Sequence, residues 1–202
     1  MEDRFYLLKV RLLDIEPEIW RRFVVPADIT LDRLHDVIQI VMGWHDYHLH
    51  DLMIGKKRYT EDPECPEDGL EEGNYYLVDL IKRKGQKFSY TYDFGDNWEH
   101  ELVLEDSRYS SPDLIAEIQC LEGERACPPE DVGSVPGYYD FCEAVKNPDD
   151  EEFESMNEWY DSFPWYESGF DSERFNLDQV NSELLKYMRW SRDRYKGWYR
   201  SE

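Results

Sequence analysis

The sequence predicts an α+β fold: a single domain with a mixed, mainly antiparallel sheet covered by helices, and a helical C-terminal part. Two observations support this. Residues 88–92 and 98–104 alternate apolar and polar side chains on either side of a turn, which is the pattern of a β-hairpin. Helical periodicity follows two strand-like runs near the N-terminus and returns near the C-terminus. At 202 residues, the chain is long enough to bury a substantial core.

The N-terminal elements are two strands and a helix. Residues 5–13 alternate until Pro17 interrupts the pattern, and residues 19–25 resume it until Pro26, so we expect neighbouring antiparallel strands. A helix is expected over residues 30–42, with Thr30 as its N-cap and Gly43 just after its last turn. Its core-facing stripe consists of Leu31, Leu34, Val37, Ile38 and Val41.

The middle of the chain leads into the hairpin. Residues 44–54 resemble a strand that places His48, His50, Leu52 and Ile54 on one face. We expect a long surface loop over residues 59–73 and a short element over 75–81. Residues 94–97 then supply the hairpin turn, with Gly95 for positive φ and Asp96 and Asn97 for hydrogen bonds from side chain to backbone.

The C-terminal third is predicted to be helical after a stiff loop. Prolines restrict residues 127–137, which form either a connector or, as the less favoured alternative, a wall of a binding cleft. Short helices are expected over residues 138–146 and 151–160. Asn176 is expected to cap a last long helix whose apolar stripe consists of Leu177, Val180, Leu184 and Met188.

Composition limits the classes of function. The net charge of −23 repels phosphate at long range, so a general role in coating DNA is disfavoured. Four cysteines without Cys-x-x-Cys spacing are typical of buried thiols in a reduced protein, and we expect a cytoplasmic location. No apolar run is long enough to cross a membrane, so no membrane partner is expected.

Residues 189–202 differ from the rest because basic and aromatic side chains alternate there. Such a segment could bind nucleic acid by stacking and phosphate contacts. We favour a docking element that buries Trp190, Tyr195 and Trp198 on the domain or on a second copy, since the acidic body repels nucleic acid. The predicted organisation is therefore a domain over residues 1–188 and a basic aromatic tail over 189–202.

Several strings occur in an order that resembles the plasmid pRiA4b ORF-3-like protein family. They include Ile19-Trp-Arg-Arg22, Met42-Gly-Trp-His45, His48-Leu-His50, Tyr92-Asp-Phe-Gly-Asp-Asn-Trp-Glu-His100 and Cys127-Pro-Pro-Glu-Asp-Val-Gly133. The resemblance spans residues 5–185, and Ser134 departs from it where a second glycine is frequent. It implies a small α+β fold in a prokaryotic, cytoplasmic protein related to passengers of mobile elements, and it assigns no activity.

The histidines are the candidates for chemistry. His48 and His50 are expected to point the same way from one strand, and His100 could join them from a neighbouring strand. Three imidazoles of this kind would bind zinc or iron. The alternative for His100 is a hydrogen-bonded core residue, because it shares its face with Trp98 and Leu102. Residues of the two longest strings are the candidates for binding a ligand or partner: Asp93, Asp96, Trp98, Glu99, Glu130 and Asp131.

Three functions are consistent with these observations. We favour an accessory interaction module without a cofactor, which presents an acidic, aromatic surface to a protein partner, because the chain lacks a complete catalytic set. The first alternative is a metal-dependent enzyme that uses His48, His50 and His100 with zinc or iron. The second is a recombination accessory protein that contacts nucleic acid through residues 189–202.

Overall fold

One eight-stranded sheet organises the chain, and its strand order is β5-β4-β3-β6-β7-β1-β2-β8. The computed structural model describes residues 4–65 and 67–190. All strand pairs are antiparallel except β4 and β5, which are parallel. The predicted α+β fold with a mixed, mainly antiparallel sheet is therefore confirmed.

The elements follow one another along the chain with these bounds: β1 (Phe5–Leu12), β2 (Trp20–Pro26), α1 (Leu31–Met42), β3 (His50–Ile54), β4 (Lys57–Thr60), β5 (Leu70–Glu71), the 3-10 turn η1 (Glu72–Asn74), α2 (Leu77–Leu80), β6 (Lys87–Tyr92), β7 (Trp98–Tyr109), β8 (Gln119–Glu124), α3 (Ser134–Ala144), α4 (Phe153–Asp161) and α5 (Leu177–Trp190).

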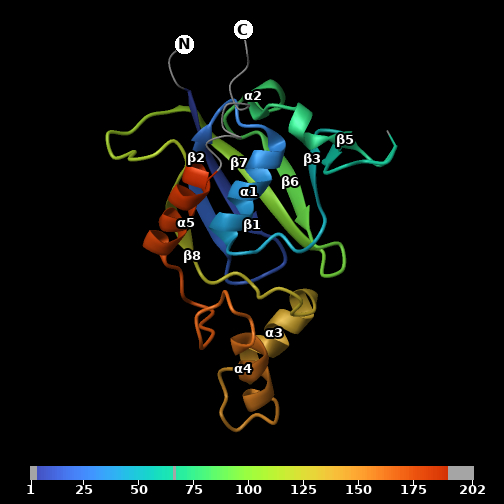
Figure 1. Cartoon of the computed structure of the whole chain (residues 1–202), viewed down its shortest axis with the longest axis vertical. Coiled ribbons are helices and arrows are strands. Elements are labelled where there is room, and N and C mark those ends of the chain that lie inside the picture. Colours follow the sequence, from blue (N-terminus) through green and yellow to red (C-terminus); the bar gives the residue numbers. More distant parts are fainter. Residues whose placement is uncertain (1–3, 66, 191–202) are drawn as a thin grey trace.

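Helices α1 and α5 lie over the sheet, whereas α3 and α4 project beyond its end (Figure 1). The core forms between α1 and the alternating inward faces of the central strands. The predicted helical stripe is buried throughout, as are Tyr6, Leu8, Val10 and Leu12 on β1. Burial of this apolar surface provides the main stabilisation of the fold, at about 25 cal/mol for each Å² removed from water.

The central hairpin forms as predicted, but its turn uses different residues. Tyr92 lies opposite Trp98, and Tyr90 lies opposite His100. The positive φ angles of the turn belong to Asp93 (55°) and Asn97 (57°), whereas Gly95 has none. Gly95 instead donates its backbone N–H to Oδ1 of Asp93 at 2.8 Å. The expectation that Gly95 would supply the positive φ was therefore wrong.

Two predictions for residues 44–73 need correction. Strand β3 begins only at His50, and residues 44–49 form a loop in which Asp46 has a φ of 56°. His48 therefore lies outside the strand, and the strand alternation that was expected to place it with His50 does not apply. The predicted surface loop over residues 59–73 contains the end of strand β4, the whole of β5 and the first two residues of the turn η1.

The C-terminal third is helical as expected, with shifted boundaries. Helix α3 begins at Ser134, so it includes the last residues of the predicted stiff loop, and Pro136 is tolerated because it lies in the first turn. Asn176 caps α5 as predicted, because its Oδ1 accepts the backbone N–H of Gln179 at 3.1 Å. Thr30 precedes α1 as expected, but its side chain forms no capping hydrogen bond. Strand β8 was not predicted.

The predicted tail is only partly described. Helix α5 continues through Arg189 to Trp190, and the side chain of Trp190 is 84% exposed. The expected burial of Trp190 on this domain is therefore not found, while the expectation for Tyr195 and Trp198 concerns residues outside the described part. Over residues 4–65 and 67–190, the helices are all too short or too polar to cross a membrane.

We predict that Gly137→Ala destabilises the protein although alanine usually favours helices. A Cβ atom at Gly137 would overlap the backbone carbonyl of Val132, which cannot move like a flexible side chain. The expected loss in free energy of unfolding, measured by urea denaturation, is roughly 1–3 kcal/mol. The matched control is Asp140→Ala at an exposed position of the same helix, with an expected change within about 0.5 kcal/mol. Equal effects of the two substitutions would contradict the close approach.

Candidate metal centre

Three loops converge beside the end of the central hairpin. The loop after α1 contributes His48, the β6–β7 turn contributes Asp93, and the loop before α3 contributes Glu130 and Asp131. Asp96 joins two of these loops, because its Oδ2 accepts the backbone N–H of Gly133 at 3.0 Å. Residues far apart in the sequence are thereby brought to one place.

Nε2 of His48 is the centre of this arrangement. It lies 3.2 Å from Oδ1 of Asp131, 3.7 Å from Oδ2 of Asp93 and 3.9 Å from Oε2 of Glu130. The nitrogen is buried and has no hydrogen-bond partner in the described part of the chain. A buried ring nitrogen normally has a partner, because leaving it unpaired costs about 1–3 kcal/mol.

These separations match those between ligands around a bound ion. Two ligands of a tetrahedral site lie about 3.4 Å apart when each bond is about 2.1 Å long. Ligand atoms of His48, Asp93 and Asp131 all lie within 4.8 Å of one another. Imidazole and carboxylate are ordinary ligands of zinc, iron and manganese. The three residues can therefore hold a divalent ion without a large rearrangement.

The carboxylates are fixed by the surrounding backbone. Glu130 is buried and accepts hydrogen bonds from the backbone N–H of His45 at 2.9 Å and the hydroxyl of Tyr92 at 3.1 Å. Burial raises the pKa of Glu130 above its usual value. Asp93 and Asp131 both have positive φ, 55° and 58°. Aspartate adopts this left-handed conformation more readily than most residues other than glycine.

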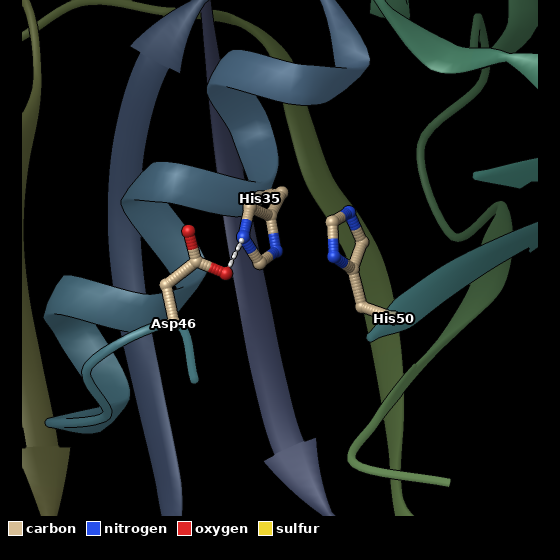
Figure 2. A group of neighbouring side chains, drawn as sticks. All are labelled: His35, Asp46 and His50. Atoms are coloured by element: carbon tan, nitrogen blue, oxygen red, sulfur yellow. Dashed lines mark hydrogen bonds and ion pairs between the residues drawn. The ribbon is translucent and has the colours of Figure 1, made fainter. Parts of the chain in front are cut away.

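A second cluster lies on the other side of the same loop. His35 and His50 stack face to face, with ring centroids 3.5 Å apart and planes 5° from parallel. Asp46 lies at the outer edge of His35, 3.0 Å from its Nε2 (Figure 2). On the opposite side, Nε2 of His50 donates to the buried carboxylate of Glu72, also at 3.0 Å. Ligand atoms of His35, Asp46 and His50 lie within 4.8 Å of one another.

The hydrogen bonds around His35 form a closed cycle with assigned directions. The backbone N–H of Asp46 donates to Oε1 of Gln39, which identifies that atom as the amide oxygen. Nε2 of Gln39 is therefore the amide nitrogen, and it donates to the hydroxyl of Tyr90. That hydroxyl donates to Nδ1 of His35, since burial raises the pKa of Tyr90 well above its usual range. Nε2–H of His35 then donates to Asp46 and closes the cycle.

This cycle favours a structural role for the second cluster. The lone pairs of an imidazole lie in its ring plane, so two stacked rings cannot aim at one ion. Nε2 of each ring is also engaged with a carboxylate. Although burial acts to raise the pKa of Asp46, the hydrogen bond from His35 holds it below its usual value. An ionised Asp46 thus anchors the loop that carries His48.

The three predicted histidines do not meet in one site. His48 and His50 belong to the two different clusters, and His100 belongs to neither. His100 is fully buried with its Nδ1–H 3.2 Å from the carbonyl oxygen of Tyr90, so the alternative of a core residue describes it. Burial lowers the pKa of His100 to about 4.

The other predicted binding residues divide in the same way. Asp93, Glu130 and Asp131 surround His48, and Asp96 supports them. Trp98 is buried in the core, and Glu99 is exposed and accepts a hydrogen bond from Asn97. Sequence reasoning missed His35 and Gln39, although two polar residues one turn apart on a buried helical face were a usable signal.

Comparisons with known proteins place this chain in a family. The model of the plasmid pRiA4b ORF-3-like protein family matches residues 4–179, which agrees with the resemblance seen in the sequence motifs. An uncharacterized protein, y4hQ from Sinorhizobium fredii, is 38% identical over 180 residues, which are 88% of this chain and 89% of the relative. The crystal structure of MM3350, a protein of unknown function from Methanosarcina mazei, has a TM-score of 0.76 and 33% identity, covering 89% of this chain and 99% of that one.

We predict that His100 makes stability depend on pH. Its folded pKa of about 4 lies below the ordinary value of 6.5, so between these values the unfolded chain binds a proton that the folded chain does not. Stability therefore falls as pH decreases through this window. Urea denaturation gives the free energy of unfolding of wild type and of His100→Gln at each pH. The difference between the two proteins should change by roughly 2 kcal/mol between pH 7 and pH 5. Parallel curves over this range would contradict the assignment.

Proposed function

We propose that this chain, which belongs to the plasmid pRiA4b ORF-3-like protein family, binds one divalent transition-metal ion through His48, Asp93 and Asp131 and uses it in catalysis. The observation that supports the proposal most is the buried, unpaired Nε2 of His48, which faces three carboxylates. The net charge of −23 also supports the proposal, because a negative surface raises the local concentration of cations.

The ligand set restricts the choice of metal. Carboxylate oxygens suit hard ions such as magnesium and calcium, whereas an imidazole shifts preference towards manganese, iron and zinc. The site combines one imidazole with carboxylates, so the expected ions are Mn²⁺, Fe²⁺ and Zn²⁺. The sequence led us to expect no cofactor, and zinc or iron was the alternative, for the different set His48, His50 and His100.

A bound ion of this class would act as a Lewis acid towards a substrate oxygen or water. Asp131 is 64% exposed, so the substrate would approach from its side of the centre. Glu130, on the buried side and 3.9 Å from Nε2 of His48, would serve as the general base. The acidic surface disfavours phosphate esters, so we infer hydrolysis of a small neutral or cationic substrate.

A second candidate function, the interaction module, is supported by an exposed apolar surface next to this centre. Tyr47, Leu49 and Phe94 are 61%, 65% and 43% exposed. The backbone N–H of Asp93 donates to the carbonyl of Leu49 at 2.9 Å, which places the neighbouring Phe94 close to Leu49. Exposed apolar groups clustered in this way are typical of surfaces that contact another protein.

We predict one metal equivalent per chain. Untagged protein treated with chelator and dialysed should bind Mn²⁺ or Zn²⁺ with a stoichiometry near one in isothermal titration calorimetry, and the ion should raise the melting temperature. His48→Ala and Asp93→Asn should each weaken binding roughly tenfold or more, because each removes a ligand.

The matched control is His45→Ala. His45 is close to His48 in the chain, but its ring packs against Trp165, with centroids 5.1 Å apart. This variant should bind the ion like wild type. A protein without saturable binding, or one whose binding survives in both ligand variants, would refute the proposed centre.

The interaction module makes a separate prediction. The tagged protein should retain a protein partner from its native cell extract at moderate salt, and the triple variant Tyr47→Ser, Leu49→Ser, Phe94→Ser should not, because it removes the apolar contact surface. Ile115→Ser, at a side chain that is 79% exposed, is the control and should retain the partner. If wild type retains nothing above background, this second candidate is wrong.

A further inference from the structure

A cavity of about 470 Å³ lies between the C-terminal end of α1, residues 126–129 and the segment 160–180. This volume is within the range of about 300–1,000 Å³ that is usual for small-molecule sites. Several aromatic side chains contribute to its walls: Trp44, Trp165, Tyr166, Phe170 and Phe175. A planar, apolar ligand therefore suits most of its surface.

One wall of the cavity contains a buried cation. Arg21 is 2% exposed and lines the cavity. Its guanidinium donates to the carbonyl oxygens of Val41, Trp20, Glu124 and Arg125 at distances between 2.7 and 2.8 Å. A guanidinium has five N–H groups, so one N–H on Nη2 has no acceptor among the residues described.

The charge of Arg21 also lacks a neighbouring carboxylate. Its acceptors are all backbone carbonyls, and it takes part in no ion pair within the described part of the chain. The charged neighbours in the wall are engaged elsewhere, since Arg174 pairs with Glu167 and Glu183 pairs with Lys186. The ring of Phe175 lies 4.2 Å from the guanidinium carbon of Arg21 and offsets part of the cost of burying the charge, and an anionic group from a ligand would supply both the missing acceptor and a counter-charge.

We propose that this cavity binds a planar aromatic carboxylate, with its ring between the aromatic walls and its carboxylate at the free N–H of Arg21. The site is distinct from the metal centre, although two residues of the cavity wall also form hydrogen bonds with Glu130 of that centre. His45 and Tyr166 line the cavity, and their backbone N–H and hydroxyl, respectively, contact Glu130. Binding in the cavity does not require a metal ligand, so the two proposals can fail separately.

The test compares two probes that differ in charge and share a ring system, 2-naphthoate and 2-naphthamide. Isothermal titration calorimetry on the full chain should show saturable binding of 2-naphthoate with a dissociation constant at least about tenfold lower than that of 2-naphthamide, which is the expected effect of one charge-assisted hydrogen bond. Equal affinities would overturn the role of Arg21, and no binding of either probe at millimolar concentration would overturn the site.

Variants on α5 locate the binding without disturbing the core. Gln179 is exposed at the cavity wall, so Gln179→Trp should obstruct the cavity and weaken 2-naphthoate binding at least tenfold. Ser182→Trp adds the same side chain at an exposed position of the helix outside the cavity wall, and it should leave binding unchanged. Loss of binding in both variants would overturn the location.

Chelator-treated protein and Asp93→Asn separate this proposal from the metal centre. Both should bind 2-naphthoate like untreated wild type, because neither treatment alters the cavity wall. Binding that disappears with the metal would overturn an independent cavity site and would place the probe at the metal centre instead.

Discussion

The hydrogen-bond cycle through Asp46, Gln39, Tyr90 and His35 is the constraint on which the site depends. It joins the exposed Asp46 of a loop to the buried side chains of His35 and Gln39 on helix α1 and of Tyr90 on strand β6, and each buried polar group left unpaired would cost about 1–3 kcal/mol. Because every member both gives and receives a hydrogen bond, the loop has one favourable position. His48 lies two residues beyond Asp46 and is therefore held in place by core packing, although it belongs to a loop.

The same loop collects negative charge around a single imidazole. Asp93 and Glu130 are buried beside His48, and Asp131 closes the group from the surface. Carboxylates this close repel one another. An arrangement with this cost persists when the surrounding structure holds it, and a bound cation would relieve the repulsion.

The sequence predicted the parts of the fold that follow from periodicity. Strands β1 and β2, helix α1 and the central hairpin alternate or repeat clearly, so their bounds were close to those observed. Strand β8 lacked such a signal because Gly123 interrupts it, where a side chain would collide with Arg21 and Phe175.

For the candidate site, the sequence predicted the types of residue but not which of them lie together in space. Strand β3 begins only at His50, so the expected alternation does not extend to His48, and nothing in the local sequence pattern indicates that boundary.

The strand order has a consequence for how the chain assembles during synthesis. Strand β1 lies between β7 and β2, and its pairing with β7 joins residues that are 88 (Leu12 and His100) to 104 (Phe5 and Tyr109) positions apart. The β1–β2 and β6–β7 hairpins are local and can form as soon as they leave the ribosome, whereas the β1–β7 pairing must wait for β7. Long-range pairing of this kind slows folding, because closing the loop between the two strands costs conformational entropy before the contacts between them form. Until then β1 keeps an open edge, which is the surface that a nascent-chain chaperone would protect.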